Sequence, residues 1–453
     1  MKRQLNWEEE IKQLFPKSSM EFLVETTKGL VREVNLDNAA TTTPFSAVNQ
    51  RVAEFLKSYG SVHRGSGQRS ITSTKDYEEA RSKIQRFVGA SLEDYVIFTK
   101  NTTEAINHAA ELWSNIPGKV LVSDIEHSSN LLPWLARNEV IQYRTNSDGT
   151  LNLTSIKEMF KKHRDIKLLA VTGSSNVTGY KPQIHNLAEL THKHSAMILI
   201  DGCQLIQHEK IDVLPNNDPR HLDFIAFSGH KMYAPFGVGV LIGQKKFFDQ
   251  ATPYQIGGGN LAYISRDLKI KRFNRVQTHD PGTPNAVGAI ALAKSIDIIK
   301  SIGYDRIYEY ESNLVRRAYK GLSKMEGVEV YLSESGLGSI IPFDVTGIDS
   351  RLTAEVLRDD YGIGVRAGTF CAYELIRKIK NISDKQDQRI TEEVERGITR
   401  NIPGVVRASF GLVNNEEDVL RLVSAINEIA RNGIEHYSQV YRQDTSTGFW
   451  IKE

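Results

Sequence analysis

Two charged residues, each directly after an apolar run, have the most informative chemistry in this chain. Lys231 closely follows the run 224–227, and Asp201 follows the run 196–200. A lysine that can form a Schiff base and a carboxylate that can keep a pyridinium nitrogen protonated are the two protein groups that pyridoxal phosphate needs most. Either residue alone is more often an ordinary loop or turn residue. Together, in this order and at the ends of two strand-like runs, they favour a site for that cofactor.

Hydroxyl and imidazole groups near these residues are candidate ligands for the cofactor's phosphate. Ser228 and His230 stand beside Lys231, and Thr102 and Thr103 lie where a strand-like run gives way to a helical pattern. Backbone N–H groups and a threonine hydroxyl at a helix N-terminus can bind an anion. The alternative for the threonines is a plain helix cap.

Three further side chains could act on a substrate. His127 follows a strand-like run, where an imidazole could stack on a pyridine ring and move a proton, although a lone histidine is more often structural. Cys371 lies in a glycine-containing stretch with Arg366 five residues upstream, and a flexible loop beside a positive charge suits a thiolate nucleophile. Arg407 interrupts an apolar run and is either a surface arginine or a binding group for a carboxylate. The other cysteine, Cys203, we interpret as a small packed side chain.

A series of apolar or β-branched runs, alternating with helical patterns, must position these side chains. Such runs are typical of strands buried on both faces of an α/β sheet, and ligands gather beyond the carboxyl ends of its strands. Polar residues at several of these ends in succession predict one site at that edge of the sheet. The expected strands are 95–98, 120–122, 140–143, 167–171, 196–200, 224–227 and 237–242, and the polar residues that follow are Asn101, Thr102, Thr103, Glu126, His127, Asn176, Asp201 and Ser228.

Composition favours a soluble enzyme and argues against several other classes. The chain has 453 residues, 40% of them hydrophobic and 25% charged, with a formal net charge of +2. Its length predicts two domains, and the small net charge gives no broad field for nucleic acid or a membrane surface. No apolar run approaches the roughly 20 residues that span a bilayer, and the N-terminus is too acidic for a signal peptide. With only two cysteines, we expect no disulfide framework, and we expect a reducing, cytoplasmic setting.

The regular alternation of runs ends near residue 301, which predicts a domain boundary. We expect a large domain over residues 35–300, a smaller α+β domain that combines 1–34 with 301–436, and a polar C-terminal tail over 437–453. The expected elements of the smaller domain are helices at 304–325, 353–361 and 416–431 and short strands at 328–332, 338–344, 364–365 and 405–409.

On these residues the chain resembles the class V aminotransferases of the type I pyridoxal phosphate fold, and within them the cysteine desulfurase and selenocysteine lyase group. The resemblance runs from about residue 35 to residue 431 and implies a mainly parallel α/β large domain with a smaller C-terminal α+β domain. The motifs that support it are Asn35-Leu36-Asp37-Asn38-Ala39-Ala40, Ser61-Val62-His63-Arg64-Gly65, Thr102-Thr103-Glu104, Glu126-His127, Ser175-Asn176-Val177, Asp201-Gly202-Cys203-Gln204, Ser228-Gly229-His230-Lys231, Gly282-Thr283-Pro284-Asn285, the segment 366–371 and Arg407-Ala408-Ser409.

The resemblance implies a role for each matching residue and no metal. Lys231 would bind pyridoxal 5'-phosphate covalently and act as base and acid at the substrate α-carbon. Cys371 would attack the substrate sulfur, keep it as a persulfide and leave alanine. Asn176 and Arg407 would bind the substrate carboxylate, with Arg366 nearby. The implied cofactor contacts are Asp201 at the ring nitrogen, Gln204 at the phenolic oxygen, His127 on the ring, Asn176 beside it, Thr102, Thr103, Ser228 and His230 at the phosphate, and Thr283 from a partner subunit, which implies a homodimer.

Two activities and one non-catalytic role stay open. The first is a cysteine desulfurase that gives alanine, passes the sulfur to a protein acceptor and could also accept selenocysteine. The second is a pyridoxal phosphate-dependent carbon–sulfur β-lyase that gives pyruvate, ammonia and sulfide or a thiol, in which Cys371 is incidental. The third is a catalytically silent binding partner, against which the presence of Lys231, Asp201, His127 and both arginines argues.

The sequence departs from close relatives at three places around the expected nucleophile. Thr369 and Phe370 precede Cys371, where many relatives have histidine or cysteine, and Ser128 stands where close relatives often have a second histidine. The charged, helix-like segment 373–402 is longer than in compact relatives. It could cover the mouth of the site or contact a different sulfur acceptor.

Overall fold

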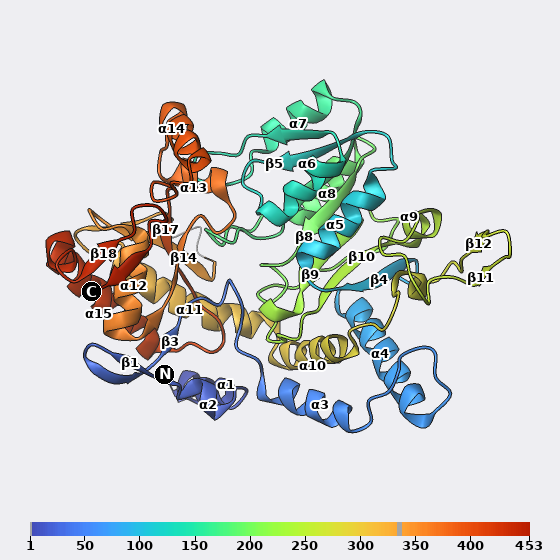
Figure 1. Ribbon diagram of the computed structural model, residues 1–453, viewed down its shortest axis with the longest axis horizontal. Helices are drawn as coiled ribbons and strands as arrows, with labels where there is room; N and C mark the ends of the chain where they lie inside the picture. The colour runs from blue at the N-terminus through green and yellow to red at the C-terminus, as the bar shows by residue number, and fades with distance from the viewer. Residues whose placement is uncertain (1, 333–337) are drawn as a thin grey trace.

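A seven-stranded sheet, called the main sheet below, forms one side of the molecule (Figure 1). The computed structural model describes residues 2–332 and 338–453. Across the main sheet the strands are β4 (Asp94–Thr99), β10 (Gly239–Gln244), β9 (Phe224–Ser228), β8 (Met197–Asp201), β7 (Ile166–Thr172), β5 (Lys119–Ser123) and β6 (Val140–Tyr143). Neighbouring strands are parallel except at β10, which runs antiparallel to both β4 and β9. The mainly parallel α/β sheet expected from the sequence is therefore confirmed.

Helices cover both faces of the main sheet, which explains why its strands read as continuous apolar runs. On one face, α5 (Thr102–Trp113) packs with alternate strand residues such as Val120 and Ala226. On the other face, α8 (Ile184–His192) and α10 (Ala286–Ile302) pack with the residues between them, such as Leu121 and Ile225. The other helices of this part of the chain are α3 (Ser46–Lys57), α4 (Gln68–Phe87), α6 (Leu132–Arg137), α7 (Leu153–Lys162) and α9 (Lys245–Gln250).

The start of α5 lies at the carboxyl edge of the main sheet. Asn101 ends the connection from β4, and its side-chain oxygen accepts a hydrogen bond of 2.9 Å from the backbone N–H of Glu104. This cap fixes the first turn, so that the helix begins at Thr102. The positive end of the helix dipole therefore faces the same edge as the ends of β8 and β9.

A four-stranded antiparallel sheet, called the second sheet below, lies on the other side of the molecule (Figure 1). Its strands, in order, are β13 (Val328–Val330), β14 (Ile340–Val345), β17 (Val405–Ser409) and β16 (Arg366–Gly368). The helices around it agree with the expected ones apart from their ends. They are α11 (Tyr304–Leu322), α12 (Ser350–Tyr361) and α15 (Glu416–Tyr437), and the segment expected to be helix-like contains α13 (Tyr373–Ile379) and α14 (Asp384–Glu395).

The N-terminal segment lies beside the second sheet, although it is far from it in sequence (Figure 1). Strand β3 (Val34–Asn35) pairs in parallel with β15 (Ile363–Gly364). The preceding elements are α1 (Lys2–Lys12), α2 (Lys17–Met20) and the hairpin of β1 (Leu23–Thr26) and β2 (Gly29–Arg32). The position of Asp37 relative to the second sheet follows from this pairing.

Two short hairpins were not expected from the sequence. Strands β11 (Tyr263–Ile264) and β12 (Ile270–Lys271) form one that extends away from the main sheet (Figure 1). Strands β18 (Tyr441–Gln443) and β19 (Trp450–Lys452) form the other, within the segment expected to be a polar tail. The second hairpin packs on α12, where the indole N–H of Trp450 donates to Asp349 at 3.3 Å. A single packed aromatic residue among polar residues gives no hydrophobic periodicity, so this hairpin could not be predicted from the sequence.

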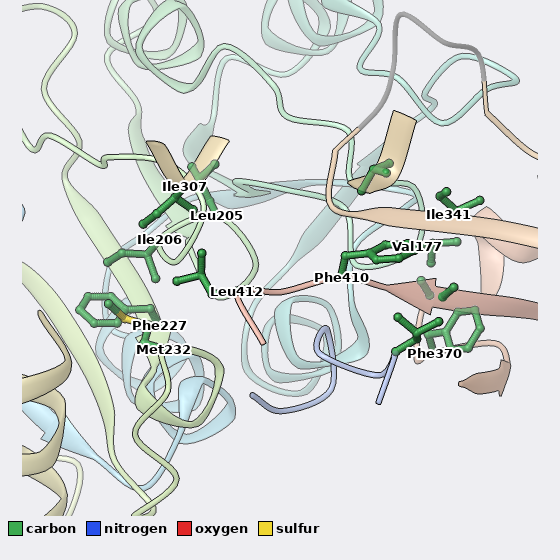
Figure 2. Close-up of a cluster of buried hydrophobic side chains, with 14 of the residues drawn as sticks. Val177, Leu205, Ile206, Phe227, Met232, Ile307, Ile341, Phe370, Phe410 and Leu412 are labelled. Atoms are coloured by element: carbon green, nitrogen blue, oxygen red, sulfur yellow. The ribbon is translucent and has the colours of Figure 1, made fainter. Parts of the chain in front are cut away.

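The hydrophobic core is continuous between the two sheets. Figure 2 shows Phe370 and Phe410 beside Val177 and Ile341, with Leu412 on the way to Phe227. No helix within residues 2–332 and 338–453 is long and apolar enough to cross a membrane. The division into domains at residues 34 and 300 is a statement about independent folding and stays a prediction.

Candidate active site

A cavity of about 390 Å³ opens at the carboxyl edge of the main sheet, facing the second sheet. It brings together side chains from the ends of β4, β8 and β9 with side chains from β16, β17 and the loop after β16. Of the site residues expected from the sequence, the cavity is lined by Thr102, Thr103, His127, Asn176, Asp201, Gln204, Ser228, His230, Lys231, Arg366, Cys371 and Arg407.

Thr283 is the expected site residue that does not line this cavity. It is exposed, in the loop before α10. The expectation that Thr283 acts in the site of a partner subunit stays a prediction.

Lys231 ends a short 3-10 turn, Gly229–Lys231, that continues directly from β9. The turn is tight because Gly229 packs against the neighbouring strand segment, where its N–H donates to the Val238 carbonyl at 2.8 Å. A Cβ atom at Gly229 would lie 2.7 Å from the Val238 side chain, so glycine is required there. Among the described residues, the Lys231 amine has no hydrogen-bond or ion-pair partner, which leaves it available to a ligand.

Asp201 ends β8 and lies next to Lys231 on the cavity wall. Burial raises the pKa of the Asp201 carboxyl above its usual value, while a hydrogen bond from the Cys203 N–H and the charge of Lys231 act in the opposite direction. A buried carboxylate is stable in its charged form only beside a positive or hydrogen-bonding partner. Gln204 lies one turn further on, and its amide donates to the Ala39 carbonyl at 2.6 Å.

Hydroxyl groups gather at the N-terminus of α5. The Ser228 hydroxyl accepts a hydrogen bond of 2.7 Å from the Thr102 N–H and lies 2.6 Å from the Thr102 hydroxyl. The Thr103 hydroxyl lies 2.8 Å from that of Ser129. Burial, followed by the charge of Lys231, lowers the pKa of His230 to about 4. A set of neutral donors at a helix N-terminus suits a phosphate group.

His127 occupies the start of a short turn, Ser128–Asn130, that follows β5. The Ser129 N–H donates to His127 Nδ1 at 3.1 Å, so in the neutral ring the proton is on Nε2. Burial, and then the charges of Lys231 and Arg407, lower the pKa of His127 to about 4. The imidazole is therefore neutral at ordinary pH.

The preceding residue, Glu126, holds the turn that includes His127 in place through hydrogen bonds. This buried carboxyl group accepts hydrogen bonds from the Ser123 hydroxyl at 2.5 Å and from the Asn130 amide at 2.7 Å. Burial raises its pKa to about 8 despite these bonds. Glu126 does not line the cavity, so its role is to position the turn.

Two arginines from the second sheet share one carboxylate. Arg407 Nη2 donates to one oxygen of Asp37 at 2.9 Å, and Arg366 Nε donates to the other at 3.0 Å. Arg407 is almost fully buried and also donates to the Asn176 carbonyl at 3.0 Å, whereas its Nε has no partner among the described atoms. Burial lowers the pKa of Arg407, while Asp37 and the thiol of Cys371 oppose that shift.

Cys371 is exposed and unpaired, and lines the cavity opposite the cofactor residues. It follows Phe370 in the loop between β16 and α13. The glycine content of this stretch predicts a flexible loop, but the structure shows a short one with specific contacts. Asn176 donates to the Phe370 carbonyl at 2.7 Å, and Ser128 donates to the Cys371 carbonyl.

The interpretation of Cys203 as a packed side chain needs correction. Cys203 is half-buried, lines the cavity and accepts a hydrogen bond from the Thr102 hydroxyl at 3.1 Å. Sequence reasoning also gave no role to Asp37 and Phe370. Asp37 had a usable signal, because it follows an apolar residue as Asp201 does, whereas Phe370 had none, because its position depends on the contact between the two sheets.

The cavity residues fit pyridoxal phosphate. A free amine, a buried carboxylate and a hydroxyl-lined helix N-terminus lie on one wall of a cavity whose size is typical of sites for small organic molecules. The cofactor expected from the sequence is thus compatible with the donors present.

Comparison with known proteins gives a consistent result. Residues 34–422 match the family model of aminotransferase class-V. A cysteine desulfurase of Shigella flexneri is 31% identical over 418 residues, which cover 89% of this chain and 96% of that protein, and one of Escherichia coli K12 matches equally. Among solved structures, the apo cysteine desulfurase of Thermococcus onnurineus NA1 is similar with a TM-score of 0.77 and 31% identity, covering 88% of this chain and 95% of that one. The Escherichia coli cysteine desulfurase CsdA is similar with a TM-score of 0.76 and 26% identity, covering 93% and 98%.

Proposed function

This chain belongs to the class-V aminotransferase family, and we propose that it is a pyridoxal phosphate-dependent cysteine desulfurase that takes up sulfur on Cys371. The observation that supports this most directly is the position of Cys371. An exposed free thiol lies on the wall of the same cavity as Lys231 and Asp201. A β-lyase would need Lys231 and Asp201 but not the thiol of Cys371.

The cofactor would be bound by the main-sheet wall of the cavity. Lys231 would form the covalent bond, Asp201 would pair with the ring nitrogen and Gln204 with the phenolic oxygen. When bound, pyridoxal phosphate supplies an electron sink for negative charge at the substrate α-carbon. The phosphate would be bound by Thr102, Thr103, Ser228 and His230, and His127 would lie against the ring.

The substrate carboxylate would be bound by the second-sheet wall. Arg407 offers a buried guanidinium with an unpartnered Nε, and Asn176 lies against it. Arg366, which shares Asp37 with Arg407, is the exposed member of the pair. A buried arginine binds a carboxylate strongly because its hydrogen bonds are charge-assisted.

Proton and sulfur transfer would then fall to two residues on opposite walls. The Lys231 amine would remove and return the proton at the substrate α-carbon. The Cys371 thiolate would attack the substrate sulfur, so that a sulfur–sulfur bond forms as the carbon–sulfur bond breaks. The electron pair of the broken bond stays with the substrate carbon, which takes up a proton and becomes the methyl group of alanine. Cysteine and a thiol thus give alanine and a persulfide with no external oxidant or reductant.

We further propose a homodimer in which Thr283 of one subunit completes the phosphate site of the other, and a protein that accepts the persulfide sulfur. The exposure of Thr283, away from its own subunit's cavity, supports the first point. Sedimentation should give a dimer, and a fully active monomer would contradict it. Whether selenocysteine is also a substrate, and the cytoplasmic location, stay predictions from the sequence.

Product analysis tests the proposed activity. The purified protein is incubated with L-cysteine, with and without a thiol reductant, and the amino-acid and keto-acid products are identified. We expect alanine, and a mass increase of one sulfur atom on the peptide that contains Cys371. Pyruvate and ammonia without that modification would replace the desulfurase by the β-lyase.

A further inference from the structure

The backbone at Phe370 and Cys371, the proposed nucleophile, has an energetically unfavourable conformation. Phe370 has φ of 52° and Cys371 has φ of 58°, both in the left-handed region. Residues with a Cβ atom seldom occupy this region, and two in succession are less common still. Contacts from outside the loop must therefore stabilise it.

These contacts come from the main-sheet side of the cavity. The Ser128 N–H donates to the Cys371 carbonyl at 2.7 Å, and the Ser128 hydroxyl donates to the same oxygen at 3.0 Å. The Asn176 amide donates to the Phe370 carbonyl at 2.7 Å. Hydrogen bonds across the cavity therefore fix two successive peptide groups of the loop.

The Phe370 side chain fixes the loop from its other side. Its ring is buried and lies near Val177 and Phe410 in the shared core (Figure 2). The Arg407 guanidinium lies 4.6 Å from the ring centroid. With the ring packed and both carbonyls bound, the direction of the Cα–Cβ bond of Cys371 is determined. That direction decides where the sulfur atom lies.

Ser128 is the residue in this set that has no other assigned task. It does not line the cavity, and both of its hydrogen-bonding donors converge on one oxygen atom. Its neighbours His127 and Ser129 do line the cavity, so the same turn positions groups on both walls.

We propose that Ser128 is a positioning residue for Cys371: its hydroxyl and N–H bind the Cys371 carbonyl and keep the thiol directed into the cavity. The description of Cys371 as a nucleophile rests on the proposed function, whereas the positioning itself does not. Ser128→Ala removes the hydrogen bond from the hydroxyl but keeps the one from the backbone N–H. The substitution therefore tests the contribution of the hydroxyl by itself.

The test compares Ser128→Ala with Ser128→Thr in the cofactor-loaded enzyme. Ser114→Ala is the matched control, because the Ser114 hydroxyl also donates to a backbone carbonyl but at the far end of α5. The first readout, taken without cysteine, is the rate at which iodoacetamide alkylates Cys371, measured on its peptide. Loss of one hydrogen bond should release the loop and change this rate about threefold or more in Ser128→Ala, while Ser128→Thr and Ser114→Ala stay near wild type.

The second readout is steady-state alanine formation. In Ser128→Ala we expect kcat to fall about three- to tenfold with KM for cysteine and the cofactor spectrum unchanged, and Ser128→Thr to recover most of the loss. Equal alkylation rates in Ser128→Ala and wild type would overturn the proposal. So would a rise in KM together with an altered cofactor spectrum, because that would indicate general damage to the turn. If wild type gives pyruvate, the proposed function fails, and the alkylation rates alone still decide the role of Ser128.

Discussion

The two walls of the cavity are built in different ways. The cofactor side, which we define as residues 101–103, 127–129, 201–204 and 228–231, is formed at the ends of strands of one sheet. The thiol side, defined as Asp37, residues 366–371 and Arg407, depends on hydrogen bonds between segments far apart in the chain. Asn176 and Phe370 are 194 positions apart, and Asp37 and Arg407 are 370 apart. The positions of the cofactor-binding residues are therefore determined within one sheet, whereas the position of the thiol is determined by the contact between the two sheets.

Removal of Lys231 should break the cofactor side with the largest effect. In Lys231→Ala we expect activity to fall by about 1,000-fold or more, because covalent attachment and proton transfer are lost together. Borohydride should fix cofactor to wild type but not to the variant, as measured by absorbance after denaturation. Lys193→Ala, which removes an exposed lysine from an ion pair on α8, should change neither. A reducible covalent adduct in Lys231→Ala would refute the assignment.

Cys371→Ser should break the thiol side while leaving the cofactor side intact. We expect alanine formation to fall by about 100-fold or more, since a hydroxyl cannot replace a thiolate as a nucleophile toward sulfur. The visible spectrum of the cofactor, and its change on adding cysteine, should be preserved. Cys203→Ser should keep the persulfide on Cys371, with a modest effect because Cys203 contacts Thr102. Full turnover of Cys371→Ser with pyruvate as the product would favour the β-lyase.

Asp37→Asn tests whether the thiol side depends on the shared carboxylate. The substitution keeps an oxygen acceptor but removes the charge that joins Arg366 and Arg407, so the guanidinium groups lose their common orientation. We expect kcat/KM for cysteine to fall about tenfold, mainly through KM, with an unchanged cofactor spectrum. Asp360→Asn, which also removes a partly buried ion pair but away from the cavity, is the control. An effect on the spectrum instead of on KM would contradict the separation of the two sides.

The smallest effect concerns the pH dependence of stability and, of the two sides of the cavity, is expected from the cofactor side. His127 and His230 have pKa values lowered to about 4 by burial and then by the charge of Lys231, against 6.5 for an ordinary histidine. Between these values the unfolded chain binds protons that the folded chain does not, so the free energy of unfolding falls as the pH is lowered from 6.5 toward 4. Replacing both residues by glutamine should reduce that fall by about 2 kcal/mol between pH 6.5 and 5.5, measured by urea denaturation. Phe370→Leu, on the thiol side, should lower stability equally at both pH values.

The same difference between the walls explains what could be predicted from the sequence. Asp201, Ser228 and Lys231 lie at or just after the ends of strands that are buried on both faces. Such strands are continuous apolar runs in the sequence and can therefore be predicted from it. Arg407 also interrupts such a run. The contacts of Phe370 and Ser128 could not be predicted, because they arise where two separately patterned parts of the chain meet. The left-handed backbone at Cys371 is imposed by those contacts and leaves no mark of its own in residues 369–372.

The late pairing of β3 has a consequence for synthesis of the chain. Strand β3, at residues 34–35, finds its partner only at residues 363–364, so about 330 further residues must leave the ribosome before the pair can form. At about 5–20 residues per second, this takes roughly 20–60 s. By the end of that interval all strands of the main sheet, the last of which ends at Gln244, are available for folding, whereas Asp37 cannot yet pair with Arg366 and Arg407. During its own biosynthesis the molecule is therefore expected to acquire a cofactor-binding wall well before it acquires a working thiol.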